Sequence, residues 1–248
     1  MSFVVFDTET TSLDKPFTYN IGYVILSENF EELARHDFVV EQIWHNLPLF
    51  SSAYYADKRP IYINRMRSRQ AIMDKFGYIC KLMRKEFKEF GVTAAYAYNS
   101  KFDERVFDFN CDWFKVINPF ESIPIFDIRG YVHCFMIDRN FMEFCEENSL
   151  FSETGNYSTS AQTLFRYVSK DTEFEEEHTA LADSVIEAQI LAECIARGAE
   201  FEVPYKTKVS IERKMEKELK VVTRDKEEHL FRYEKITISK DKTKITLK

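Results

Sequence analysis

The sequence predicts an α/β protein built on a mixed five-stranded sheet with helices on its faces. Two observations support this fold class. Three apolar runs joined by short links open the chain, which is typical of a three-strand antiparallel meander. Two later apolar runs alternate with helical stretches, which is typical of parallel strands connected through helices.

The first strand is expected at residues 3–6, an uninterrupted apolar run that favours a strand buried on both faces. The next two strands are expected at 21–26 and 36–40, joined through a turn at 27–30. Residues 41–60 show no clear period and include two prolines, so they are expected to form a loop.

One long helix is expected over residues 61–90, ended by Gly91, with a strand at 93–98 after it. Its predicted inner face is apolar and consists of Ile61, Ile72, Phe76, Ile79, Cys80, Met83 and Phe87.

The remaining elements follow the same alternation. A helix is expected at 104–109 and a strand at 123–128; further helices are expected at 129–147, 159–169 and 179–197. Beyond them, residues 205–222 are a charged helical candidate, and the alternation over 230–247 predicts a β-hairpin turning at 240–242. We therefore expect a main domain over residues 1–200 and a small C-terminal extension over 201–248.

The composition suits a soluble, cytoplasmic protein. With 45% apolar residues in 248, the chain can bury a full core, and no apolar stretch approaches the roughly 20 residues that a membrane helix needs. The first expected strand begins at residue 3, which leaves no space for a signal peptide. Five widely spaced cysteines without a Cys-x-x-Cys pair indicate buried free thiols in a reducing compartment.

The charge is unevenly distributed. The net charge of −7 argues against a nucleic-acid partner, yet residues 58–90 hold ten basic side chains against three acidic ones, and residues 201–248 hold 14 against 9. One stretch of the main domain is therefore strongly basic within an acidic protein, and the extension is basic as well.

Three segments that contain carboxylates carry the chemistry. Asp7 and Glu9 follow the first strand and project to the same side of it, because side chains alternate along a strand. Two carboxylates side by side repel each other, and a divalent cation relieves that repulsion. The other two segments are Tyr-Asn-x-x-Phe-Asp, ending at Asp103, and His-x4-Asp, from His178 to Asp183.

In this order and spacing, the segments resemble the three motifs of the DnaQ-like (DEDD) 3′–5′ exonucleases, in the histidine-containing branch, which have the ribonuclease H-like fold. The resemblance covers residues 3–195, with departures at Ser12, where a glycine is common, and at Tyr98, where a histidine is frequent. Neither departure affects a ligand.

The resemblance implies a two-metal phosphodiester hydrolase. Asp7, Glu9, Asp103 and Asp183 would hold two Mg²⁺ or Mn²⁺ ions about 4 Å apart, and His178 would be the general base. Because five residues span about 140° around a helix axis, His178 and Asp183 converge only if the helix begins between them. Taken singly, each acid has a plainer interpretation, as a solvated strand end or a helix N-terminal charge.

The resemblance also implies substrate contacts. Thr10 and Leu13 would line the pocket of the terminal nucleotide, the backbone at Thr8 would meet the 3′ hydroxyl, and Asn99 would shape its turn. A candidate track for single-stranded nucleic acid consists of Lys58, Arg59, Arg65, Arg67 and Arg69, with Tyr54, Tyr55 and Tyr62 as stacking surfaces; the alternative is a solvated helix face with core tyrosines.

The expected substrate is the 3′ end of single-stranded DNA, with release of nucleoside 5′-monophosphates. An exoribonuclease is the nearest alternative, because no residue reveals how a 2′ hydroxyl is treated. A second alternative is a subunit that docks to a polymerase or another replication protein through residues 201–248. A third is an endonuclease of the wider ribonuclease H-like group, although that group usually lacks this first motif.

Overall fold

The computed structural model describes residues 2–199 and four short strands at 218–222, 228–232, 236–238 and 245–247. The chain divides into two compact units: the first is Met1–Phe126 with Glu175–Ala188, and the second is Asp127–Phe174 with Gln189–Lys248. The domain boundary expected at residue 200 stays a prediction. Within the described part of the chain, every helix is too short or too polar to cross a membrane.

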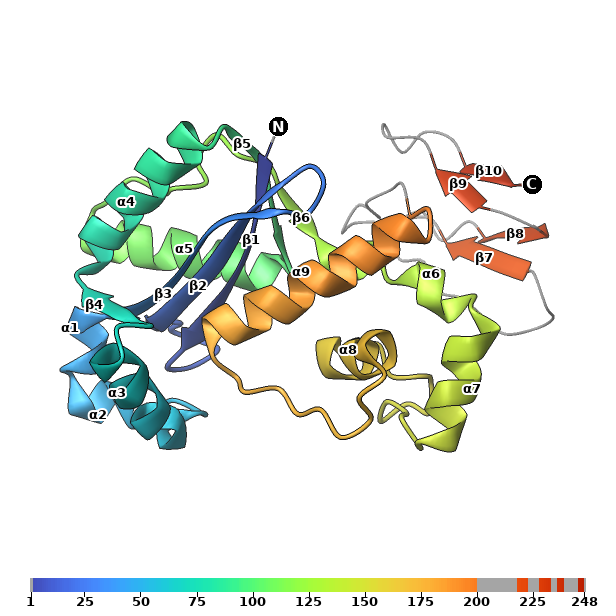
Figure 1. The fold of residues 1–248 in the computed structure, drawn as a ribbon, viewed down its shortest axis with the longest axis horizontal. Coiled ribbons are helices and arrows are strands. Elements are labelled where there is room, and N and C mark those ends of the chain that lie inside the picture. The colour runs from blue at the N-terminus through green and yellow to red at the C-terminus, as the bar shows by residue number, and fades with distance from the viewer. Residues whose placement is uncertain (1, 200–217, 223–227, 233–235, 239–244, 248) are drawn as a thin grey trace. The chain divides into compact units, whose positions relative to one another are not determined.

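A mixed sheet with strand order β4-β3-β2-β1-β5-β6 organises the fold (Figure 1). The strands are β1 (Ser2–Thr10), β2 (Thr18–Ser27), β3 (Glu32–Val40), β4 (Ile72–Asp74), β5 (Val92–Ala97) and β6 (Ile125–Asp127). β1, β2 and β3 form an antiparallel meander, and β5 runs parallel to β1. The predicted fold class is confirmed as a mixed α/β sheet in which an antiparallel meander is followed by parallel strands.

The sheet has one strand more than expected, because the predicted helix over 61–90 is wrong in its middle. The chain forms α3 (Arg59–Arg67), then β4, then α4 (Phe76–Glu89). Arg69 takes a left-handed backbone conformation, with φ 61°, that ends α3, and β4 then pairs with the free edge of β3. Ile72 is therefore exposed rather than part of an inner face, whereas the expected inner face of α4 is buried.

Helices cover both faces of this sheet. The α5 helix (Lys101–Phe114) packs on the face that carries Phe6, whose ring contacts that of Phe107 at 5.7 Å between centroids. The α9 helix (Ala180–Ala196) begins on the other face, where Ser184 Oγ donates to the Gly22 carbonyl at 3.1 Å. Short helices α1 (Glu41–Trp44), α2 (Leu47–Phe50) and η1 (Ala56–Lys58) occupy the loop expected over 41–60.

The second unit is mainly helical. It contains η2 (Ile128–Gly130), α6 (His133–Met136), α7 (Arg139–Glu147) and α8 (Ala161–Ser169). The helical stretch expected over 129–147 is present but interrupted, because Asp138 takes an extended conformation and caps α7 by accepting from the Asn140 amide. The helices expected at 159–169 and 179–197 are confirmed within two residues, and Gly198 follows α9 with φ 80°.

The extension forms two antiparallel pairs. β7 (Glu218–Val222) pairs with β8 (Glu228–Arg232), and β9 (Ile236–Ile238) pairs with β10 (Ile245–Leu247). The helix expected over 205–222 is therefore wrong for residues 218–222, where the β-branched Val221 and Val222 favour a strand; residues 205–217 lie outside the described part. The expected turn at 240–242 falls between β9 and β10 and also lies outside it.

Candidate active site

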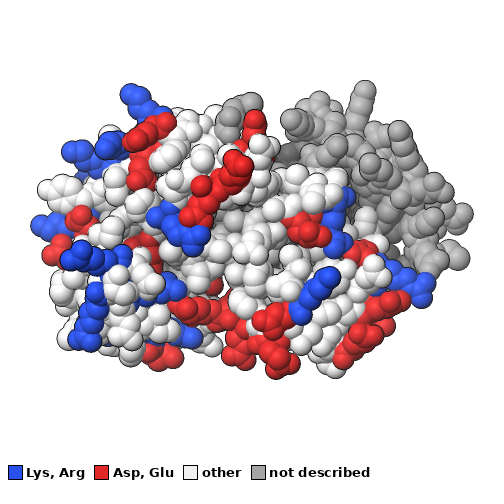
Figure 2. Space-filling model, viewed as in Figure 1, with Lys and Arg blue, Asp and Glu red and all other residues white. Residues whose placement is uncertain are grey.

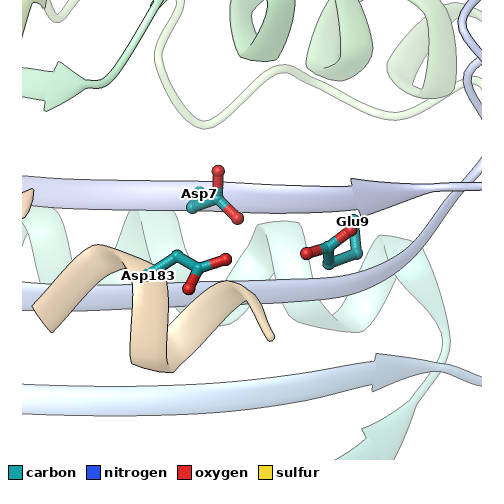
Figure 3. A group of neighbouring side chains, drawn as sticks. All are labelled: Asp7, Glu9 and Asp183. Carbon is teal, nitrogen blue, oxygen red and sulfur yellow. The ribbon is translucent and has the colours of Figure 1, made fainter. Parts of the chain in front are cut away.

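Three of the predicted metal ligands meet at one place. Asp7 and Glu9 lie on β1, and Asp183 lies in the first turn of α9. One carboxylate oxygen from each lies within 4.8 Å of the others, and Figure 3 shows the three side chains turned toward a shared space. The first and third sequence motifs, about 170 residues apart in the chain, therefore build a single acidic cluster.

The cluster is electrostatically unfavourable without a counter-charge. Burial, followed by the charge of Glu176, raises the pKa of Asp7 to about 7. Burial, followed by the charge of Asp7, raises the pKa of Asp183 to about 9 and the pKa of Glu9 well above its usual range. The fold thus holds the three acids together at a cost that either bound protons or a cation must offset.

The donor set fits a hard divalent cation. Mg²⁺ and Mn²⁺ prefer carboxylate oxygens, and the cluster provides three such groups. The Oδ1 atom of Asp183 is buried and has no hydrogen-bond partner among the described residues. Because a buried carboxylate oxygen without a partner is rare, this atom supports a missing ligand at this position.

Asp103 lies beside the cluster and not within it. Its side chain is buried at the start of α5, where Oδ1 accepts a 2.6 Å hydrogen bond from Thr8 Oγ1. Burial, and then the charge of Asp7, raises the pKa of Asp103 well above its usual range. The second motif is therefore electrically coupled to the first, and the Thr8 hydroxyl is used in orienting Asp103.

His178 lies just before α9, as the spacing argument required. The helix begins at Ala180, and Asp183 lies within it. The imidazole stacks on the ring of Tyr55, at 4.4 Å between centroids and 12° between planes, and its Nδ1 lies 3.7 Å from Glu176 Oε2. Burial, and then the charge of Lys58, lowers the pKa of His178, which favours the neutral imidazole that a general base needs.

Glu187 is an acidic residue near the cluster that none of the three sequence motifs contains. It lies one turn after Asp183 on α9, is 4% exposed, and accepts a hydrogen bond from the Tyr98 amide at 3.2 Å. Burial, and then the charges of Asp7, Asp103 and Asp183, raise the pKa of Glu187 well above its usual range. The spacing of four residues from Asp183 is the one signal that could have found it.

The predicted nucleotide-pocket residues lie around the end of β1. Thr10 ends this strand, and Leu13 follows with 74% of its surface exposed, its carbonyl accepting a 3.0 Å hydrogen bond from Arg105. Asn99 lies in the turn between β5 and α5 with φ 61°. An exposed leucine is consistent with a wedge against a base, and this role stays a prediction.

The basic residues divide into different environments. Figure 2 shows Lys and Arg gathered on the side of the first unit where α3 and α4 lie. The Arg59 guanidinium lies 4.3 Å from the Trp44 ring centroid, and Arg65 forms ion pairs with Asp37 and Glu177. Lys58 ends η1 and is close enough to His178 to affect its pKa.

The three candidate stacking tyrosines also differ. Tyr54 is 87% exposed, and Tyr55 contacts His178. Tyr62 is fully buried, so its prediction as a stacking surface is wrong; its ring packs against Tyr19 and Trp44 in the core.

Comparisons with known proteins give only distant likenesses. No protein-family model matches the chain, and no curated protein matches its sequence. Escherichia coli exonuclease I with a dT13 oligonucleotide superposes with 15% identity and a TM-score of 0.46 over 80% of this chain and 41% of the other. The same enzyme with a dA16 oligonucleotide superposes with 12% identity and a TM-score of 0.47, over 90% of this chain and 54% of the other. Exonuclease I of Methylocaldum szegediense superposes with 14% identity and a TM-score of 0.44, over 80% of this chain and 41% of the other. The chain thus spans about half or less of these proteins, and likenesses this distant support no conclusion about chemistry.

Proposed function

We propose that the protein is a metal-dependent 3′–5′ exonuclease that removes nucleotides from single-stranded DNA. The observation that carries this proposal is the meeting of Asp7, Glu9 and Asp183, together with the buried Asp183 Oδ1 that has no hydrogen-bond partner among the described residues. The nearby acid Asp103 and the histidine His178 complete the set of groups that the sequence motifs predict.

Two Mg²⁺ or Mn²⁺ ions, held by Asp7, Glu9 and Asp183 with Asp103 beside them, would supply Lewis-acid activation of water and stabilisation of the leaving oxygen. Side chains of the protein provide the proton transfer and the orientation of the base. His178, neutral and half-buried, takes the proton of the attacking water. The stack on Tyr55 fixes the plane of the imidazole.

The reaction is a hydrolysis at the last phosphodiester. The water oxygen bonds to phosphorus while the bond from phosphorus to the 3′ oxygen of the preceding nucleotide breaks, which releases a nucleoside 5′-monophosphate and a shortened strand with a new 3′ hydroxyl. Leu13 and Thr10 would bracket the terminal nucleotide and Asn99 would approach its backbone. Contacts of this kind position a strand without reading its sequence.

The exposed Tyr54, and Lys58 four residues later in the sequence, support a single strand as the substrate. An exposed aromatic ring gives a base a stacking surface, and a lysine can meet a phosphate. RNA is the alternative polymer, and docking to a polymerase through residues 201–248 is an alternative role for the extension.

The test is digestion of 5′-labelled single-stranded DNA and RNA of the same sequence with Mg²⁺, followed on a gel that resolves each nucleotide. We expect a ladder that shortens from the 3′ end, faster for DNA, and that Asp7→Ala and His178→Ala abolish. Glu89→Ala removes an exposed acid of α4 and serves as the control. Cleavage of neither polymer by the wild type would overturn the proposal.

A further inference from the structure

The backbone of His178 is held in an unfavourable conformation. Its φ is 54°, in the left-handed region that residues with a Cβ rarely adopt. Such a conformation persists only where the surroundings impose it, and it is found at functional sites. The contacts made by the residues on either side of His178 are therefore the ones that can hold its backbone in this conformation.

On the N-terminal side, Glu177 is held by two donors. Arg65 Nη2 of α3 donates to Glu177 Oε1 at 2.5 Å, and Thr179 Oγ1 donates to the same oxygen at 3.1 Å. On the C-terminal side, the Ala180 amide donates to Asn20 Oδ1 of β2 at 2.8 Å. The residues before and after His178 are thus tied to two different elements of the first unit.

Both ties meet at one buried carboxylate. Asp37 of β3 is 2% exposed; its Oδ1 accepts from Asn20 Nδ2 at 2.6 Å, and its Oδ2 accepts from Arg65 Nη1 at 2.9 Å. A carboxylate that accepts from both partners fixes their relative positions. Arg65, Asp37 and Asn20, which we name the histidine clamp, therefore bracket His178 from both sides.

We propose that the histidine clamp is a positioning device that holds the His178 imidazole against Tyr55 in its working orientation. The inference rests on the proposed function, in which His178 is the base. It assigns Arg65 a role different from that of a phosphate ligand, because each terminal nitrogen of its guanidinium already donates to a carboxylate of the fold. An arginine suits this place because a lysine has no planar fork to reach two carboxylates at once.

The two roles of Arg65 predict different kinetics. A positioning residue acts on the chemical step, so its loss lowers kcat and leaves KM nearly unchanged. A phosphate ligand acts on substrate binding, so its loss raises KM. Misplacement of a catalytic group by about 1 Å costs roughly 100-fold in rate, which sets the expected size of the effect.

The experiment uses the full chain with four substitutions. Arg65→Met removes both ion pairs, Arg65→Lys retains the charge without the fork, and Glu177→Ala removes the tie to the segment before α9 while Arg65 keeps its contact with Asp37. The control, Arg35→Met, removes an exposed arginine–glutamate pair with Glu32 on β3. Arg65→Met removes the counter-charge of the buried Asp37 and could prevent folding; Glu177→Ala leaves that ion pair in place and still tests the clamp.

Two readouts are taken. With single-stranded DNA and Mg²⁺, we expect kcat to fall about 100-fold in Arg65→Met and about 10-fold in Glu177→Ala, with KM within twofold. Arg65→Lys should lie between wild type and Arg65→Met, and Arg35→Met should match wild type. In metal-free protein labelled at histidine, the ring signals of His178, assigned with His178→Ala, should lose their ring-current displacement in Arg65→Met and Glu177→Ala.

The result that would overturn the clamp is a raised KM with unchanged kcat in Arg65→Met, or ring signals of His178 unaltered in both variants. Wild-type protein that cleaves no polymer would refute the proposed function alone. The ring signals would still decide whether Arg65 and Glu177 position His178, since that measurement needs neither metal nor substrate.

Discussion

Gly22 of β2 and Leu181 of α9 are in backbone contact: a Cβ built on Gly22 would lie 2.0 Å from the Leu181 nitrogen. Gly22 is paired in register with Asp7 on β1. The missing side chain therefore lets the first turn of α9 reach the sheet next to the first motif, which brings Asp183 to Asp7 and Glu9.

Replacing Gly22 by alanine should push α9 away from the sheet. No flexible side chain can yield, because the atoms in the way belong to the helix backbone. We expect Gly22→Ala to lose about 2 kcal/mol or more of unfolding free energy, as overpacked cores do, and to lose nearly all activity. Urea unfolding and a gel assay measure both. Gly155→Ala places a Cβ in open space in the second unit, so it should leave activity unchanged although the φ of 77° strains an alanine there. An active Gly22→Ala protein would contradict the close approach.

Removing one acid from the cluster should stabilise the metal-free protein at alkaline pH. The folded pKa of Asp183 is about 9 against 3.8 in the unfolded chain, so its contribution is most favourable below pH 3.8 and is lost as the pH rises toward 9. Asp183→Asn does not lose stability in this way, because an asparagine side chain does not ionise. At pH 8 without metal, the variant should be more stable than wild type by a few kcal/mol, and at pH 4 the two should be nearly equal.

Metal should reduce this difference. Ions at roughly 100 times their dissociation constant stabilise wild type by about 2.7 kcal/mol, and Asp183→Asn should gain far less because it lacks one ligand. Thermal unfolding at pH 8 with EDTA, and then with Mg²⁺ or Mn²⁺, measures both effects. Equal stabilisation of the two proteins by metal would show that Asp183 is not a ligand.

Glu187 should matter through its hydrogen bond more than through its charge. Glu187→Gln keeps an oxygen for the Tyr98 amide, so activity should stay within a few-fold of wild type. Glu187→Ala removes this hydrogen bond at a partly buried position, which costs about 1–3 kcal/mol, and should loosen the turn at Asn99 before Asp103. Denaturant unfolding and kcat of both variants are the measurements. A Glu187→Gln protein as impaired as Glu187→Ala would instead indicate that the charge is required.

The sequence predicts the parts of this site that local patterns determine. The apolar run before Asp7 identifies β1, and the spacing from His178 to Asp183 predicts where α9 begins. It does not predict β4, because pairing with the edge of β3 competes with helical propensity only once the sheet exists. Likewise, Tyr54 and Tyr62 lie on either side of Lys58 and Arg59 in the sequence, and only the packing of α3 buries Tyr62 while Tyr54 stays exposed.

Long-range polar contacts were the least predictable feature. Arg65 lies 28 residues from Asp37 and 112 from Glu177, so its partners cannot be identified from neighbouring charges. The position of Asp37 in a predicted strand does indicate that this acid has a polar partner. An acid within a buried strand needs a donor, because an unpaired buried charge is strongly destabilising. The burial of Asp37 therefore predicts a basic partner, but it does not identify which of the ten basic residues between 58 and 90 this partner is.

Lys58 should set the acid limit of activity. Its positive charge disfavours the imidazolium of His178 and contributes to the lowered pKa of that histidine, after burial. In Lys58→Met the pKa of His178 rises, so the base becomes protonated at a higher pH. The acid limb of the profile of kcat against pH should therefore move to higher pH in Lys58→Met, and about 0.5 M salt should reduce the difference between the variant and wild type. Arg67→Met, which removes an exposed charge of α3, is the control and should leave the limb in place. A shift in KM without a shift of the limb would mean that Lys58 contacts the nucleic acid and does not influence the base.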